Sequence, residues 1–167
     1  MKYTILKNGN LMLEDVEPRD VVRRNFSGER SQYGTRDIAV RVPDEIADQL
    51  EELHYNMWER RTNDAGEYLD PVVSAKIDFF DDPDDNRNPV IIKISSKRKM
   101  AIKTYGELDR LDRLNFATMD IEFRVFQRQR PQPGYSTAVK YLNFVLDDYA
   151  SPLASKYDDV PYYEDEE

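Results

Sequence analysis

The clearest pattern in the chain is a strict alternation of apolar and polar residues that begins near Thr118. From Met119 to Val125 every odd-numbered position is apolar, and every position between them is charged. This alternation is typical of a half-buried strand, because successive side chains leave opposite faces of the backbone. A second strand, richer in apolar residues, is predicted from Thr137 to Leu146. Together the two runs predict a β-hairpin within Thr118–Asp148.

The loop that joins these runs, Gln127 to Tyr135, contains arginines, glutamines, prolines and a tyrosine but no acid. This composition is unusual in a chain whose formal net charge is −9. We therefore expect the loop to contact a polyanion, and we interpret the hairpin as part of a small β-barrel that grips single-stranded nucleic acid.

Similar patterns predict further strands and two short helices. The strands are Val21–Gly28, Arg36–Val42, Val72–Phe80 and Pro89–Ser95, and the helices are Glu45–Tyr55 and Thr104–Asn115. The last two of these strands are expected to pair with each other across an acidic turn. Asp44 can cap the first helix, and Thr104 and Glu107 form a capping box for the second.

The order of these elements determines the expected fold class. Strands and helices do not alternate regularly, as they would in a parallel α/β sheet. We therefore expect an α+β fold, mainly antiparallel, with an OB-type barrel of five or six strands and two short helices. Residues 1–15 are interpreted as an N-terminal extension or strand, 16–150 as an OB-like nucleic-acid-binding domain, and 151–167 as an acidic, disordered tail.

The negative charge is concentrated at the end of the chain. Residues Asp158–Glu167 contain six acids and no base, and removing these six negative charges changes the net charge from −9 to −3. The rest of the chain is therefore close to balance and can carry local basic patches.

Several classes of protein are not expected. The chain has no cysteine, no run of about 18 apolar residues and no signal-peptide layout, which favours a cytoplasmic location, in the host if the protein is viral. The single histidine, His54, has no second His or Cys with which to bind zinc, and no phosphate loop or nucleophile elbow is present. The acidic stretch Asp81–Asn86 lacks the ligand spacing of a calcium loop and is interpreted as a solvated turn. We expect no enzymatic activity, metal or cofactor.

The candidate chemistry lies in cations that neighbour aromatic rings at strand ends and loops. Proteins that bind single strands combine cations, which follow the phosphates, with flat rings that stack on unpaired bases. Aromatic rings in strands are also common in cores, so any single ring can be structural instead. The candidate nucleic-acid-binding residues are Arg24, Phe26, Tyr33, Arg36, Trp58, Arg60, Lys97, Arg98, Lys99, Phe126, Arg128, Tyr135, Lys140 and Tyr141.

Parts of the chain resemble phage-type single-stranded DNA-binding proteins. The segments concerned are Val21–Gly28, Asp44–Tyr55, Val73–Phe79 with Pro89–Lys97, and Val139–Leu142, within roughly residues 16 to 146. The resemblance implies an OB-fold, cytoplasmic action on phage DNA and an acidic tail that binds partners. Many such tails end in an aromatic or Pro-Phe group, whereas this chain ends in Glu166-Glu167, so a docking mode that needs a terminal ring is in doubt.

The resulting hypothesis is a non-enzymatic protein that coats single-stranded DNA during phage replication or recombination. Its acidic tail would bind replication or recombination proteins, and self-association is left open. An alternative is an acidic interaction module, such as a DNA mimic or an inhibitor of a host nucleic-acid-binding protein, which the net charge and the Asp81–Asp85 cluster favour. A third hypothesis is a structural component of a virion.

Overall fold

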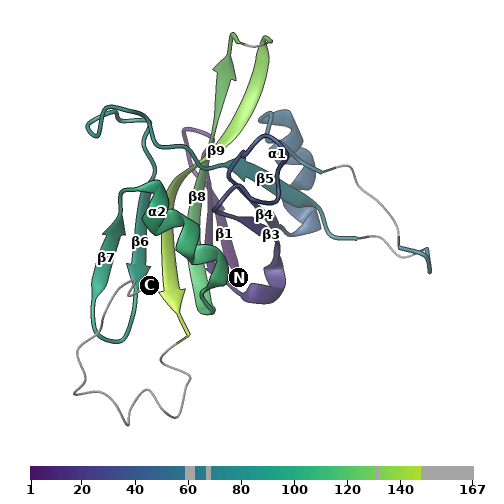
Figure 1. The fold of residues 1–167 in the computed structure, drawn as a ribbon. Coiled ribbons are helices and arrows are strands. Elements are labelled where there is room, and N and C mark those ends of the chain that lie inside the picture. Colours follow the sequence, from purple (N-terminus) through teal and green to yellow (C-terminus); the bar gives the residue numbers. More distant parts are fainter. Residues whose placement is uncertain (59–62, 67–68, 131, 148–167) are drawn as a thin grey trace.

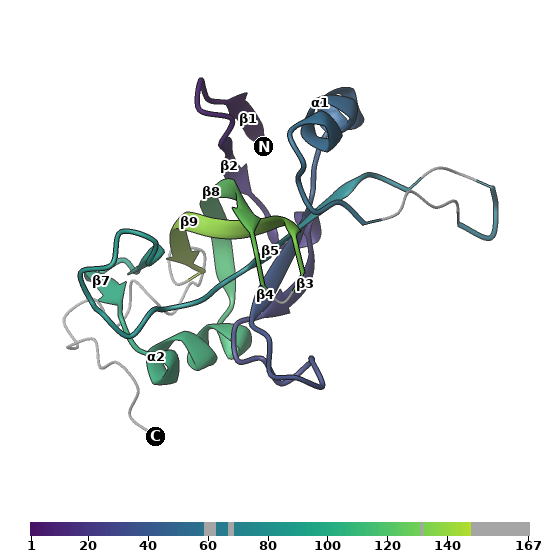
Figure 2. The ribbon, with the colours of Figure 1, turned by 90° about the horizontal axis from the view of Figure 1, so that it is seen from above.

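One mixed sheet organises the chain (Figures 1 and 2). The computed structural model describes residues 1–58, 63–66, 69–130 and 132–147, so the predicted tail (151–167) and Arg60 lie outside the described residues. The strands are β1 (Lys2–Ile5), β2 (Leu11–Val16), β3 (Val21–Asn25), β4 (Asp37–Arg41), β5 (Val72–Lys76), β6 (Val90–Ile94), β7 (Lys99–Ile102), β8 (Phe116–Arg128) and β9 (Gly134–Leu146). The α-helices are α1 (Ala47–Glu52) and α2 (Tyr105–Asp109), and the 3-10 turns are η1 (Pro18–Asp20), η2 (Asp44–Ile46) and η3 (Arg110–Arg113).

The hairpin predicted from the alternation is confirmed. β8 and β9 pair antiparallel along their whole length, with two register shifts, one between Phe116 and Thr118 and one between Glu122 and Phe123. At the second shift, Lys140 of β9 has no strand residue directly opposite it. The odd-numbered Ile121 and Phe123 are buried, whereas the charged Glu122 and Arg124 that follow them are only partly buried. The loop end of the hairpin extends beyond the rest of the sheet, at the top of Figure 1.

The predicted pairing of the two middle strands is wrong. β5 and β6 both pair with β9, in parallel, β5 at Ala138 and β6 from Tyr141 to Val145. β9 is 13 residues long, so its edge accommodates both strands, and the segment from Ile77 to Pro89 loops out between them. The other edge of β6 pairs with β7, a strand that was not predicted.

The sheet confirms a mainly antiparallel α+β fold but not a closed barrel. The strand path runs β1-β2-β8-β9-β5-β4-β3, and within the described residues no ladder joins its two ends. β2 and β3 are nevertheless consecutive in the chain and separated only by Glu17 and η1. The bent segment from Leu11 to Asn25 therefore pairs with β8 through its first half and with β4 through its second.

The core lies between the inner face of the sheet and the two helices. Phe26 and Phe144 meet edge to face with their centroids 6.1 Å apart, and both rings are fully buried. Leu50 of α1 and Leu108 of α2 are also fully buried, as their helical stripes predicted. Both α-helices are shorter than expected. After α1 the backbone turns at His54, which has a φ of +70°, and α2 tightens into η3.

The capping box of the second helix is confirmed, with Thr104 and Glu107 each bonding the other's backbone N–H. In the described ranges, no helix combines the length and apolar content needed to cross a membrane.

Candidate nucleic-acid interface

A row of mostly charged residues crosses the outer face of the sheet. The register places Asp37 of β4 beside Lys76 of β5, Lys76 beside Ala138 of β9, and Ala138 beside Arg124 of β8. The neighbouring residues Ile38, Ala75 and Phe123 are buried in the core, so this cross-strand row faces outward.

The two cations of the cross-strand row differ in their surroundings. Lys76 is exposed, and in the part of the chain that the structure describes its side-chain ammonium has no hydrogen-bond or ion-pair partner. Arg124 is half-buried, and this burial lowers the pKa of its guanidinium, which lies 4.6 Å from the centroid of the Phe126 ring. Asp37 is bound by Arg23 at 2.7 Å, which leaves Lys76 as the cation available to a phosphate.

One end of the cross-strand row leads into the β8–β9 hairpin. We call Phe126, Arg128, Tyr135, Lys140 and Tyr141 the hairpin arm. Arg128 Nη1 donates to the carbonyl of Tyr135 at 2.7 Å and to Ser136 Oγ at 2.8 Å, which holds the guanidinium against the turn. Lys140 Nζ lies 3.8 Å from a Glu122 oxygen and 5.5 Å from the centroid of the Tyr141 ring. Tyr141 is 45% exposed. Tyr135 is 40% exposed, but it pairs with Gln127, so its ring lies on the face of the hairpin opposite Phe126 and Arg128.

Beyond the other end of the row lie β3 and the 26–36 loop. In β3, Arg24 pairs with the buried Ile38, and its side chain therefore leaves the sheet on the core-facing side. We call Arg24, Arg30, Tyr33 and Arg36 the arginine arm. Arg24 Nη1 donates to the carbonyl of Leu114 at 2.7 Å, and burial lowers the pKa of this guanidinium. The Arg36 guanidinium lies 4.0 Å from the centroid of the Tyr105 ring. Tyr33 is 85% exposed at the tip of the loop.

Asp112 of η3 positions the arginine arm. Its two carboxylate oxygens accept from the backbone N–H of Phe26 at 2.6 Å and of Ser27 at 3.0 Å. Asp109, at the end of α2, forms an ion pair with Arg36, with Nη2 of Arg36 2.9 Å from Oδ1 of Asp109. These contacts fix the start and end of the 26–36 loop against α2 and η3.

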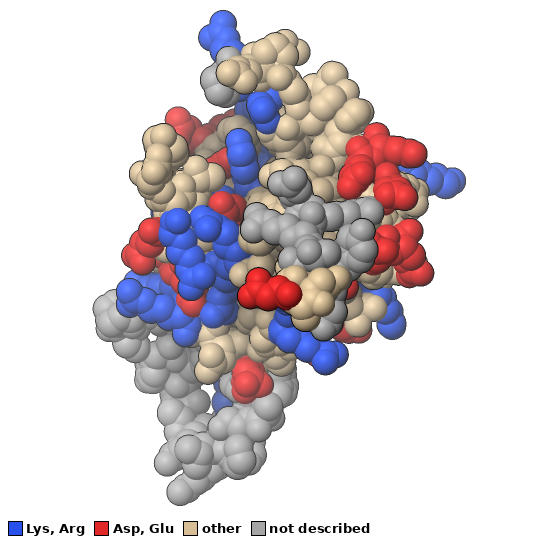
Figure 3. Space-filling model, turned by 90° about the vertical axis from the view of Figure 1, so that its right-hand side faces the viewer, with Lys and Arg blue, Asp and Glu red and all other residues tan. Residues whose placement is uncertain are grey.

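In Figure 3 a dense group of Lys and Arg occupies one side of the view and a dense group of Asp and Glu the other.

Not all of the predicted residues join this surface. Phe26 is the clear correction: its ring is fully buried against Phe144, so it cannot stack on a base and belongs to the core. Trp58 is half-buried beside β5, where its backbone N–H donates to the carbonyl of Val72. Lys97, Arg98 and Lys99 are exposed at the β6–β7 turn. Because β6 runs parallel to β9, this turn lies at the end of the sheet opposite the β8–β9 loop (Figure 1).

The cross-strand row contains two cations that the sequence reasoning did not select. Lys76 and Arg124 are polar positions in strands whose alternation was recognised, so the signal was present. What was missing was the register, which alone shows that they lie in one row. Tyr105 was also missed, because its place under Arg36 depends on how α2 packs.

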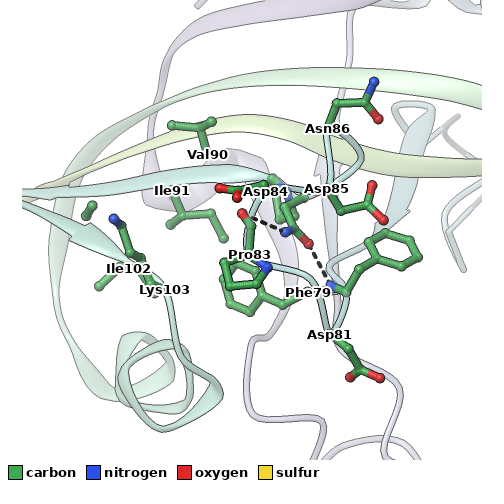
Figure 4. A pocket seen from close by; sticks show the side chains of 14 residues that line it. Phe79, Asp81, Pro83, Asp84, Asp85, Asn86, Val90, Ile91, Ile102 and Lys103 are labelled. Atoms are coloured by element: carbon green, nitrogen blue, oxygen red, sulfur yellow. Dashed lines mark hydrogen bonds between the residues drawn. The ribbon is translucent and has the colours of Figure 1, made fainter.

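A cavity of about 510 Å³ lies between the 79–89 segment and the β6–β7 pair (Figure 4). Phe79, Pro83, Val90 and Ile102 line its apolar part, and Asp81 and Asp84 line its acidic part. Among the described residues, no group of three or more His, Cys, Asp or Glu side chains is arranged to hold a metal ion. Carboxylates repel phosphates, so this cavity does not fit the nucleic-acid interface.

The acidic turn beside this cavity is held by its own side chains. Asn88 Oδ1 accepts from the N–H of Phe80 at 2.6 Å, and its amide donates to the carbonyl of Asp82 at 2.9 Å. Arg87 binds both oxygens of Asp85, which lowers the pKa of this carboxyl to about 2. The stretch is therefore an organised turn, as its sequence predicted.

Comparison with known proteins identifies a shared fold. No protein-family model and no curated protein matches the sequence. The structure is similar to the single-stranded DNA-binding protein from bacteriophage Enc34 in complex with ssDNA, with a TM-score of 0.50 and 11% identity over 87% of this chain and 90% of that chain. A C-terminal truncation of the same phage protein gives a TM-score of 0.49, 12% identity and the same coverage. The predicted resemblance to phage single-stranded DNA-binding proteins is thus confirmed at the level of the fold.

Proposed function

We propose that the protein binds single-stranded DNA along the outer face of its sheet, from the arginine arm across Lys76 to the hairpin arm. The observation that carries this proposal is the cross-strand row, which aligns Lys76 and Arg124 on the outer face of the sheet. The similar phage protein was solved with ssDNA bound, which supports the same ligand for this fold.

The two arms supply the two kinds of contact that a single strand needs. The exposed rings of Tyr33 and Tyr141 would stack on bases, and such stacking is worth roughly 1–3 kcal/mol per base. Lys76 and Arg124 would bind the phosphates between them. The contacts of Arg128 and Arg36 with the protein hold these side chains in place before the strand arrives, which lowers the entropic cost of binding.

The biological role that fits this surface is the coating of unwound strands during phage DNA replication or recombination, in the host cytoplasm. The bent Leu11–Asn25 segment would act as one strand of an OB-type barrel. The acidic residues of 151–167 would bind basic surfaces of replication or recombination proteins. None of these roles requires a catalytic group.

The test is a titration of the full chain with a fluorescently labelled oligo-dT, followed by anisotropy and by Trp58 and tyrosine emission. We expect saturable binding at low salt, with log K falling against log salt by about 0.7 for each phosphate contact. The same titration is made with a chain that ends at residue 156. Absence of binding by both chains at low salt would remove the proposal.

The alternative of a DNA mimic is not favoured by this surface. A mimic presents carboxylates over a folded face, whereas the cross-strand row and the two arms present cations and rings. The mimic hypothesis predicts no affinity for oligonucleotides at any salt concentration, so the same titration separates the two.

A further inference from the structure

A second cavity, of about 400 Å³, opens where three parts of the chain meet: the β1–β2 turn, the end of α1 and the β8–β9 hairpin. Its size is within the range of pockets that hold small organic groups. None of the residues that line it carries a charge, which distinguishes it from the acidic cavity beside β6. A phosphate is therefore not its natural occupant, whereas a neutral group is.

The polar part of this cavity consists of amides. Asn8 Oδ1 accepts from the N–H of Asn10 at 3.0 Å, and Gln127 Nε2 donates to the Tyr135 hydroxyl at 3.3 Å. Neither Asn8 Nδ2 nor Gln127 Oε1 has a hydrogen-bond partner among the residues that the structure describes. Asn8 therefore offers the cavity an amide donor, and Gln127 offers it an amide acceptor.

The rest of the lining is apolar or aromatic, from Leu53, Val125, Phe126 and Tyr135. The Tyr135 ring is stacked on His54, with the centroids 3.8 Å apart and the planes at 7°. The left-handed backbone at His54 brings its ring to this position, and the N–H of His54 bonds the carbonyl of Glu51. Tyr55 Oη donates to the carbonyl of Gly9 at 2.7 Å and so ties the β1–β2 turn to the end of α1. The walls are therefore held in place without a ligand.

We propose that this cavity receives one nucleobase of the bound strand and favours a base with an amino group beside a ring nitrogen, adenine or cytosine, over thymine. The inference rests on the proposed function, because the base must be delivered by a strand held on the hairpin arm. Phe126 and Tyr135 belong to both the hairpin arm and the cavity lining, and Arg128 Nη1 donates to the carbonyl of Tyr135 at 2.7 Å. A phosphate held at Arg128 therefore lies close enough for its base to enter the cavity. Adenine and cytosine each present an amino donor beside a ring-nitrogen acceptor, which a spare amide oxygen and a spare amide N–H can bind, whereas thymine has no amino group.

The test compares two oligonucleotides of equal length, one alternating adenine and cytosine and the other consisting of thymine alone. Neither is self-complementary, and in any register the first strand offers the cavity an amino group beside a ring nitrogen, whereas the second never does. We expect the full chain to bind the adenine–cytosine strand about fivefold or more tightly. A double variant, Asn8→Ala with Gln127→Leu, is expected to bring the ratio close to one and to keep the salt dependence.

Gln129→Leu is the matched control, because this exposed amide lies two residues further along the chain and does not line the cavity. It should keep the wild-type ratio. Asn8 and Gln127 are exposed, so the double variant should unfold at the wild-type temperature. A ratio near one in the wild-type chain, or a ratio that survives the double variant, overturns the inference while salt-dependent binding still supports the proposed function. Failure of both strands to bind at low salt overturns the proposed function itself.

Discussion

Lys76→Gln is the most direct test of the cross-strand row. Lys76 is exposed and, within the described ranges, has no partner, so the substitution removes a charge without breaking a contact in the protein. The free energy of unfolding should therefore change by no more than about 0.5 kcal/mol. A loss of DNA affinity would then come from the contact with DNA itself.

The expected size follows from the release of counterions. Each phosphate contact on a single strand contributes about 0.7 to the slope of log K against log salt. Losing one contact should make the slope shallower by about 0.7. If the variant and the wild-type chain bind equally at 1 M salt, the variant should therefore bind about fivefold more weakly at 0.1 M salt. Anisotropy titrations with labelled oligo-dT at five or six salt concentrations measure both quantities.

Lys2→Gln provides the control, because it makes the same change of net charge on β1, at the far end of the strand path. It should leave the slope close to that of the wild-type chain. If Lys76→Gln keeps the wild-type slope, Lys76 does not contact a phosphate. If the two variants shift the slope equally, the effect reports net charge, and the path across β5 is wrong.

Three further predictions follow from individual side chains. Tyr33→Ala should weaken binding of oligo-dT by about 5- to 150-fold, the loss of one stacked base, and an unchanged affinity in titrations would exclude the 26–36 loop from the interface. Phe26→Ala should lower the free energy of unfolding in urea by about 3–5 kcal/mol, because its ring is fully buried, and a near-neutral effect would contradict its place in the core. Burial raises the pKa of Tyr55 to about 12, so its contribution to stability is complete below pH 10 and is lost as the pH rises through 12. Unfolding measured from pH 9 to 12 should therefore show less pH dependence in Tyr55→Phe, and an equal dependence would count against this account.

The strongest sequence prediction, the β8–β9 hairpin, depended only on neighbouring residues. Alternation between Met119 and Val125 determines which side chains can be buried together, whatever else the chain does. The Thr104–Glu107 capping box is local in the same way, since both partners lie within one helical turn. Features of this kind are present in the sequence itself.

The errors concern contacts between distant segments. β6 was assigned to β5 because the two are consecutive strands, but the long edge of β9 pairs with both. Phe26 lies in a segment whose sequence mixes cations and a ring, and only the packing of Phe144 against it shows that the ring is internal. Backbone pairing and ring burial are decided by which surfaces meet, and a local pattern does not contain that information.

The sequence by itself determined most of the strands, the capped start of α2 and the supply of cations and rings for a nucleic-acid surface. It did not determine β7 or the start of α1, which begins at Ala47 without the predicted Asp44 cap. The tertiary structure alone decided which of them share that surface. Ala138 of β9 lies between Lys76 and Arg124 in the cross-strand row, whereas Lys97–Lys99 lie at the other end of the sheet. The tertiary structure also assembled the amide-lined cavity from Asn8 and Gln127, which are far apart in the chain. The physical reason is that periodicity acts over a few residues, whereas a binding surface is set by the register and packing of segments that the sequence does not place side by side.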